Sequence, residues 1–141
     1  APSTSLNSSF GTLMNNTRLA ANSGANTLVY DSDVGRAAQL HANDMYTRNY
    51  DSVQILGGGG DDIGDRVTDQ GYSWEDIAQL IDRGENTTAD QVAAFSDDVC
   101  DAPNGTCFAR NNFAHFGVAR AGSGADTRWV LVLTDPTGPN P

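Results

Sequence analysis

The sequence contains no lysine, so its eight basic residues are all arginines, set against 16 aspartates and two glutamates. The resulting net charge of −10 repels phosphate backbones and anionic membrane surfaces, so we expect no nucleic-acid partner. No apolar run approaches the roughly 20 residues that span a bilayer, so we also expect no membrane span. Cations, basic proteins and neutral ligands remain compatible with this charge.

Cysteine is also scarce, because only Cys100 and Cys107 occur. The segment between them contains Pro103 and the turn pair Asn104-Gly105, which brings the two ends together. This predicts a small disulfide loop, with two reduced and buried thiols as the alternative. A disulfide persists in an oxidising compartment, so we expect a secreted, extracellular or periplasmic protein.

The length of 141 residues fits one domain that buries a core of its own. Aromatic residues make up 8% of the chain, a content that favours a folded globular protein over a disordered one. We therefore expect a single domain over residues 1–141, with flexible ends at 1–6 and 136–141, and a monomer.

Helical spacing of apolar residues dominates the first half of the chain. It predicts a helix over residues 7–21 and a second helix capped by Asp31 or Asp33. The second helix carries one apolar stripe: Val34, Ala37, Ala38, His41 and Met45. We expect His41 to be a hydrogen-bonded core histidine.

A glycine- and aspartate-rich loop at residues 57–65 follows, and then a short helix that stops before Gly71. A strand comes next, and after it a helix that opens with a capping box formed by Thr88 and Gln91. Two strands end the chain. The first, in "FAHFGVARA", alternates with period two, and "RWVLVLTD" is a continuous apolar run typical of a central strand covered on both faces. This order indicates an α+β fold.

Several segments together resemble the CAP superfamily, the group of sperm-coating-protein, plant pathogenesis-related and insect-allergen domains. They are "LVYDSDVGRAAQLHANDM", "GDRVTDQGYSWEDIA", "VAAF", "FAHFGVARA" and "WVLVLTD". The likeness runs from about Leu13 to Asp135 and is most similar to the bacterial branch. It implies a three-layer α–β–α sandwich with a small antiparallel sheet, secretion, and a central cleft. Family members are mostly non-enzymatic, and their reported roles include binding sterols, fatty acids and other proteins.

The family's cleft typically holds two histidines and two acidic residues, which bind a divalent cation such as zinc in some members. The resemblance places Val53 at the first histidine and Asn104 at the second. Glu75 takes one acidic position, with Asp76 beside it in place of an asparagine, and Asp98 takes the other. The cleft is therefore degenerate. We expect Trp74 and Ile77 to pack while Glu75 points into the cleft or braces a loop.

No cofactor is required by these residues, but three sets of side chains are candidates for a divalent cation. Glu75 and Asp98 offer oxygen ligands that favour Ca²⁺ or Mg²⁺ over Zn²⁺. His115 is a candidate cleft or metal-binding residue beside Glu75, with a partly exposed strand histidine as the alternative. The glycine-rich loop offers Asp61, Asp62 and Asp65, with a solvated loop as the alternative.

These observations favour a secreted, non-enzymatic CAP-like domain. Its ligand is a small apolar molecule such as a lipid or sterol, a divalent cation, or a protein partner. The alternatives are an extracellular hydrolase using Glu75 with Asp98 or His115, and a calcium-stabilised structural module built on residues 57–65.

Overall fold

The computed structural model describes residues 3–52, 62–84, 87–98 and 106–136. Over these ranges the chain forms helices, strands and two short 3₁₀ turns in the following order: α1 (Thr4–Ala21), β1 (Val29–Tyr30), α2 (Ser32–Arg48), α3 (Ile63–Asp69), β2 (Trp74–Arg83), α4 (Thr88–Ser96), η1 (Cys107–Ala109), β3 (His115–Ala121), η2 (Gly124–Asp126) and β4 (Arg128–Pro136).

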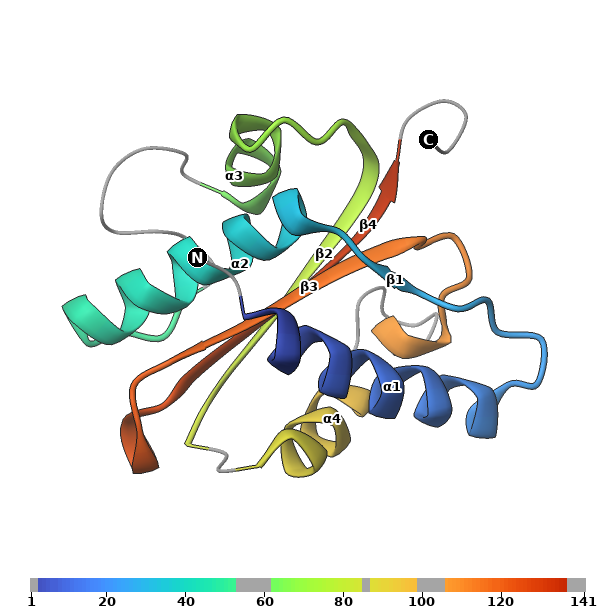
Figure 1. The fold of residues 1–141 in the computed structure, drawn as a ribbon, viewed down its shortest axis with the longest axis horizontal. Coiled ribbons are helices and arrows are strands. Elements are labelled where there is room, and N and C mark those ends of the chain that lie inside the picture. Colours follow the sequence, from blue (N-terminus) through green and yellow to red (C-terminus); the bar gives the residue numbers. More distant parts are fainter. Residues whose placement is uncertain (1–2, 53–61, 85–86, 99–105, 137–141) are drawn as a thin grey trace.

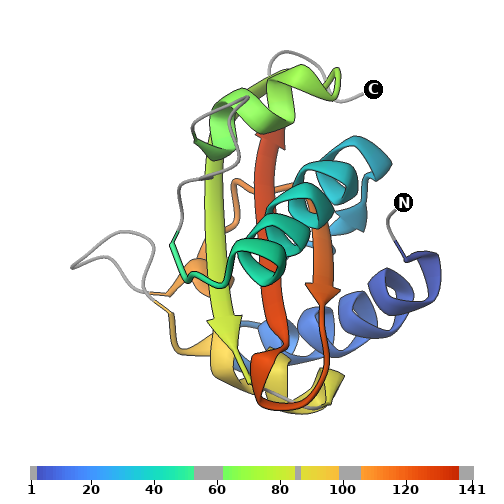
Figure 2. The ribbon, with the colours of Figure 1, turned by 90° about the vertical axis from the view of Figure 1, so that its left-hand side faces the viewer.

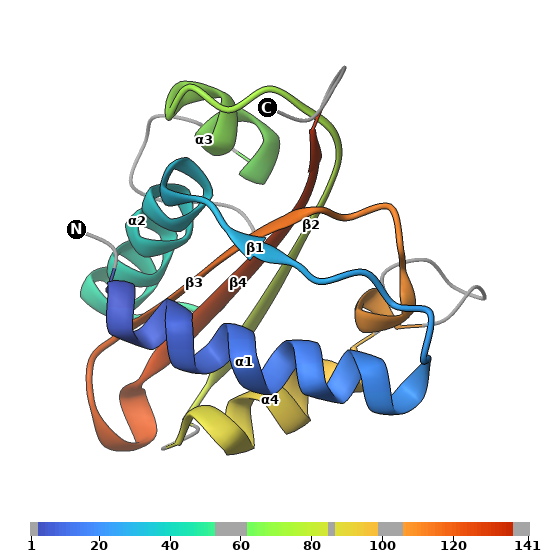
Figure 3. The same cartoon turned by 45° about the vertical axis from the view of Figure 1, so that its right-hand side comes forward.

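The four strands form one sheet in the order β1-β3-β4-β2. β4 pairs antiparallel with both β2 and β3, while β1 pairs parallel with β3. Figure 3 shows the chain leaving α1, running beside β3 as β1 and then entering α2. The sheet is therefore mixed and not wholly antiparallel as expected. β1 was missed because its two residues are too few for an alternating pattern.

The helices cover both faces of this sheet, so the fold is the α–β–α sandwich that the resemblance implied. α1 and α4 lie on one side of the strands, and α2 and α3 lie on the other (Figure 1). Each side has its own hydrophobic cluster: Phe10, Phe95, Trp129 and Leu131 belong to the first. Figure 2 looks onto the sheet from the α2 side, with β4 between β2 and β3.

β4 contributes buried residues to both hydrophobic clusters. Trp129, Leu131 and Leu133 pack towards α1, and Val130 and Val132 pack towards α2, all with no exposed surface. This confirms the prediction that the apolar run is a central strand covered on both faces.

α2 also matches its prediction. Asp31 is the N-cap, and its carboxylate accepts hydrogen bonds from the backbone N–H groups of Asp33 and Val34. The expected stripe is buried along its whole length: Val34, Ala37, Ala38, His41 and Met45. The helix ends at Asn49, whose left-handed conformation (φ 54°) turns the chain towards residues 50–52.

Two helix starts differ from the prediction. α1 begins at Thr4 after the N-cap Ser3, so residues 4–6, expected in a flexible end, form its first turn. α4 is capped by Thr87, whose hydroxyl accepts from the backbone N–H of Asp90. The expected Thr88–Gln91 capping box is therefore wrong by one residue, and Gln91 turns inward, fully buried. α3 ends before Gly71 as predicted.

α2 lies unusually close to β3 because Gly117 faces it. A Cβ added at Gly117 would stand 2.4 Å from the backbone N of Gly35. Glycine is therefore required there by the close approach of two backbones. Among the described helices, none combines the length and the apolar composition of a membrane-spanning segment.

Candidate functional site

Glu75 lies at the start of the edge strand β2, where the pairing with β4 slips by one residue between Trp74 and Asp76. Glu75 is the extra residue of this bulge, and its side chain is exposed. The described residues give its carboxylate no hydrogen bond or ion pair. Trp74 and Ile77 do pack, as expected, against the cluster beneath α2 and α3. The indole N–H of Trp74 donates to the carbonyl of Gly64 at 3.2 Å.

Asp76 is held by three groups. Its Oδ1 accepts from the backbone N–H of Ile77 at 2.9 Å. Its Oδ2 pairs with the guanidinium of Arg110 and accepts from Asn112 Nδ2 at 2.8 Å. These contacts tie the start of β2 to the segment that leads into β3, so the carboxylate already has a structural partner.

Asp98 follows α4, and its side chain is half-buried. Burial raises the pKa of the Asp98 carboxyl, and the charges of Asp82 and then Asp97 raise it further. Glu75 and Asp82 lie seven residues apart on one extended strand, a separation of about 23 Å. Whether Glu75 and Asp98 face each other stays a prediction. Carboxylates that flank a glycosidic bond stand about 5–9.5 Å apart, which is the separation that the hydrolase alternative requires of this pair.

His115 belongs to a buried hydrogen-bond chain. Thr134 Oγ1 has two acceptors in reach, the phenol oxygen of Tyr72 at 2.9 Å and the His115 carbonyl at 3.4 Å, and its single proton goes to the nearer one. The phenol oxygen lies 2.7 Å from His115 Nδ1. Because Thr134 donates to Tyr72, the phenol proton is free to go to Nδ1, which leaves the imidazole proton on Nε2. Burial raises the pKa of Tyr72 and keeps the phenol protonated. His115 is half-buried, and no hydrogen bond joins it to Glu75.

His41 is buried in the core, as the sequence indicates, but only one of its two ring nitrogens is hydrogen-bonded. Its Nε2 donates to the carbonyl of Ser52 at 2.6 Å, but its Nδ1 has no hydrogen-bond partner. Burial, followed by the charge of Arg66, lowers the pKa of His41 to about 4. The imidazole is therefore neutral at physiological pH and fixed in its Nε2–H form.

The remaining candidates fall partly outside the described residues, among them Val53, Asp61, Asn104 and Cys100. Cys107 is buried and disulfide-bonded; its expected partner, Cys100, lies outside the described residues, so the pairing itself stays a prediction. Asp62 is the N-cap of α3 and accepts from the backbone N–H of Asp65 at 2.9 Å. Over the described ranges, no group of three or more His, Cys, Asp or Glu side chains is arranged to hold a metal. Whether the chain binds a divalent cation, and which one, stays a prediction.

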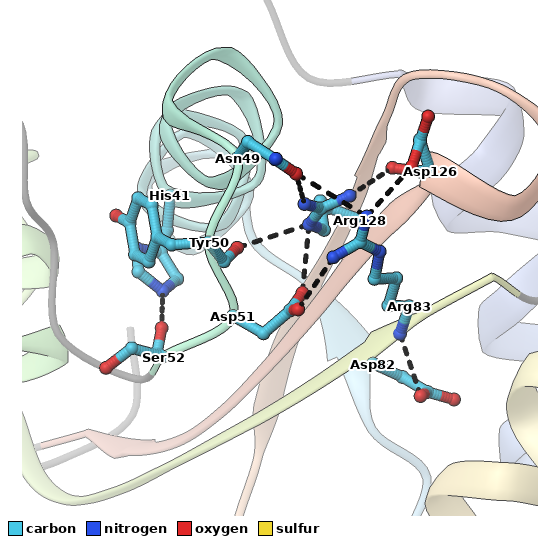
Figure 4. Close-up of polar contacts among 9 residues, drawn as sticks. All are labelled: His41, Asn49, Tyr50, Asp51, Ser52, Asp82, Arg83, Asp126 and Arg128. Atoms are coloured by element: carbon cyan, nitrogen blue, oxygen red, sulfur yellow. Dashed lines mark hydrogen bonds and ion pairs between the residues drawn. The ribbon is translucent and has the colours of Figure 1, made fainter.

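A pocket of about 190 Å³ lies at the other end of β2, lined by Asp51, Ile81, Asp82 and Arg83. Figure 4 shows the polar side chains around it. Arg83 pairs with Asp51 at 3.0 Å and with Asp126 at 2.8 Å. The backbone N–H of Arg83 donates to Asp82 Oδ1 at 2.8 Å.

Arg128, the first residue of β4, contacts the same group of side chains. Its guanidinium is buried and lies 2.9 Å from Asp51 Oδ1, 2.8 Å from Asn49 Oδ1 and 3.2 Å from the carbonyl of Tyr50 (Figure 4). Sequence reasoning did not find this cluster. No sequence pattern predicts it, because Arg83 and Arg128 become neighbours only through the β2–β4 register.

The mixed sheet between two helical layers, with this element order, defines a CAP-type α–β–α sandwich. The profile of the Cysteine-rich secretory protein family (CAP) matches residues 12–133, and the chain belongs to that family. Among curated protein sequences, no match was found.

Solved structures agree on the fold. An outer surface protein from Borrelia burgdorferi superposes with a TM-score of 0.76 at 12% identity, covering 95% of each chain. An extracellular protein containing an SCP domain from Bacillus anthracis gives a TM-score of 0.67 at 20% identity, covering 90% of this chain and 39% of that one. The venom allergen-like protein 4 of Schistosoma mansoni gives 0.53 at 11% identity, covering 95% and 86%. At these identities the likeness shows the fold alone.

Proposed function

We propose that this CAP domain is secreted and acts outside the cytoplasm as a non-catalytic binding protein. Membership of the family supports this proposal, together with the descriptions of two similar structures as an outer surface protein and an extracellular protein. The ligand contact is the pocket at the end of β2, next to Asp82 and Arg83.

The size and charge of this pocket carry the proposal. At about 190 Å³ it is below the roughly 300–1,000 Å³ of sites that enclose drug-sized ligands. A sterol is therefore a poor fit for this pocket. A ligand of a few atoms, or one side chain of a protein partner, suits it better. The guanidinium of Arg83 is already paired with Asp51 and Asp126, so the wall nearest Asp82 favours a positively charged group.

The hydrolase alternative has less support. Glu75 is exposed and makes no hydrogen bond to the described residues, and the Nδ1 atom of His115, the other candidate partner, is occupied by Tyr72. The calcium-stabilised module on residues 57–65 remains a prediction, since residues 57–61 lie outside the described ranges.

Chemical-shift mapping tests the proposal. The ¹⁵N-labelled domain is titrated with a panel of small amines, short sugars, a fatty acid and metal chlorides. We expect shifts to cluster on Asp51 and residues 81–83, and to weaken in Asp82→Asn. The matched control is Asp69→Asn, which removes the same charge from an exposed position at the end of α3. Shifts that are identical in both variants would place the binding elsewhere.

A separate experiment tests for catalysis. The domain is incubated with panels of glycans and peptides, and product formation is followed in the wild type and in Glu75→Gln. We expect no turnover in either protein. Turnover that disappears in Glu75→Gln would overturn the proposal in favour of a hydrolase.

A further inference from the structure

β2 is an edge strand of the sheet, because among the described strands it pairs only with β4. Backbone N–H groups along an antiparallel strand point alternately to its two sides. The N–H of Gly84 donates at 2.9 Å to the carbonyl of Thr127, on the β4 side. The N–H of Arg83 donates instead to the side chain of Asp82 at 2.8 Å. The backbone of Arg83 therefore points away from β4, and so does that of Ile81, two residues earlier.

The outward backbone groups of Ile81 lie at the pocket, which Ile81 lines together with Asp51, Asp82 and Arg83. Over the described residues, no group accepts a hydrogen bond from the Ile81 N–H or donates one to its carbonyl. Side chains of successive strand residues alternate between the two faces of a sheet, so a pocket that touches residues 81–83 follows the outer edge of β2. The pocket thus offers a backbone donor and acceptor beside a half-buried apolar side chain.

The charges around the pocket determine which partner fits. Asp82 receives a hydrogen bond from Gln91 Nε2 at 3.1 Å, but within the described residues it has no ion pair. Arg83 directs its guanidinium to Asp51 and Asp126 (Figure 4), so it does not neutralise Asp82. The whole chain carries a net charge of −10. A basic segment is therefore attracted to this edge, whereas a second copy of the chain is repelled.

We propose that the outer edge of β2 at residues 81–83 binds an extended basic segment of a partner protein, which adds a strand to the sheet. A partner residue opposite Ile81 exchanges both backbone hydrogen bonds with it, as in β-strand addition generally. Its side chain lies on the same face as that of Ile81 and is apolar. The next partner residue lies opposite Asp82 and is lysine or arginine. The ligand therefore alternates apolar and basic residues.

The open part of the edge is short. Towards the start of β2, the N–H of Ile77 already donates to Asp76 Oδ1 at 2.9 Å, and at the other end Arg83 is bonded to Asp82. The partner is therefore held by a few backbone hydrogen bonds and one charged contact. This inference rests on the proposed function, because it names the class of ligand for the same pocket. The cleft that the CAP resemblance assigned includes neither Ile81 nor Asp82.

Titration of the ¹⁵N-labelled domain with a short capped peptide of alternating valine and lysine tests the proposal. We expect the Ile81 amide proton to move downfield and its exchange with solvent to slow about tenfold or more, because this N–H gains an acceptor. The amide of Arg83, which is already bonded to Asp82, should change less. A peptide of alternating valine and glutamate should not bind.

The backbone contribution is separated from the charge by a second peptide, N-methylated at its valines. It keeps the lysines and the side chains but loses the donors that face β2, so it should bind about tenfold or more weakly. Ile81→Pro removes the outward N–H, a change that edge strands tolerate, and should weaken the plain peptide similarly. Ile81→Val is the matched control and should bind like the wild type. If Ile81→Pro does not fold, the comparison of the two peptides decides.

Equal binding of the plain and the N-methylated peptide would overturn strand addition, and so would an unchanged Ile81 amide. If a simple alkylamine still shifts residues 81–83 in that case, the proposed function stands. No shift at these residues with any peptide or amine would overturn both. Light scattering covers the remaining occupant: a concentration-dependent dimer that the peptide dissociates would replace the partner segment by a second copy of the chain.

Discussion

The carboxylate of Asp51 joins two arginines, with Oδ2 at 3.0 Å from Arg83 Nη1 and Oδ1 at 2.9 Å from Arg128 Nε (Figure 4). Only one of the two arginines is buried: the Arg128 side chain is 1% exposed, and that of Arg83 is 38% exposed. The pair with Arg128 therefore compensates a charge that has left water, whereas the pair with Arg83 is screened by solvent.

We expect Asp51→Asn to lower the free energy of unfolding by about 2 kcal/mol, because it leaves the Arg128 guanidinium with neutral acceptors only. Asp51 is itself 43% exposed, which keeps the loss below that of a fully buried pair. Urea denaturation measures the difference. The control is Asp126→Asn, whose side chain is 67% exposed and pairs only with Arg83, so it should change little. Equal losses in both variants would contradict this account.

A second prediction concerns the close approach of α2 and β3. Gly117→Ala places a methyl group 2.4 Å from Gly35 N and 2.6 Å from Gly35 Cα. These are backbone atoms of a packed helix, so the clash can be relieved only by moving α2 off the sheet. We expect a loss of about 3 kcal/mol or more in thermal or urea unfolding. Gly24→Ala, where the nearest atom would be Asn22 Oδ1 at 3.5 Å, should remain close to wild type.

Much of the fold could be predicted because its signals are local. The apolar run of β4 and the stripe of α2 are patterns within nine and twelve consecutive residues, and burial follows directly from them. The cap at Asp31 is equally local. β1 was missed because a strand of two residues is too short to show an alternating pattern. The Thr87 cap was missed because Thr87 and Thr88 are equally good N-cap residues on sequence grounds.

The site could not be predicted in the same way. Asp51 meets Arg83 across 32 residues, and Tyr50 meets Arg128 across 78, contacts that depend on the sheet register. The family resemblance placed Glu75 and Asp98 in one cleft, but it did not reveal the bulge that leaves Glu75 exposed. Whether Glu75 binds a ligand stays a prediction.

His41 makes stability depend on pH. Its pKa is about 4 in the folded chain, against 6.5 for a free imidazole. Between these values the unfolded chain takes up a proton that the folded chain does not, so the free energy of unfolding falls as pH falls from about 6.5 to 4. We expect a loss of about 2–3 kcal/mol from this residue over that window.

Urea denaturation at several pH values in the window measures the effect of His41. Carboxylates also titrate near its lower end, so the comparison is with His41→Gln, which can donate to the Ser52 carbonyl but does not ionise. The wild type should lose more stability than His41→Gln as the pH falls. Parallel curves for the two proteins would show that His41 is not the cause.

The last prediction concerns the proton on His115. Tyr72 receives a hydrogen bond from Thr134 and so donates its own proton to His115 Nδ1, leaving Nε2 protonated. Long-range ¹H–¹⁵N spectra at alkaline pH should therefore show one tautomer in the wild type. Tyr72→Phe removes the donor, so both tautomers should appear, with a stability loss of about 1 kcal/mol from the broken hydrogen bonds.

Tyr46→Phe, at an exposed tyrosine on α2, is the matched control and should retain the single tautomer. Finding Nδ1–H in the wild type would reverse the direction assigned to the Tyr72 hydrogen bond. The tautomer matters for binding, because an Nε2–H group donates to an oxygen atom and cannot coordinate a metal. As long as Tyr72 holds the ring this way, His115 presents a hydrogen-bond donor to a ligand and not a metal-coordinating nitrogen.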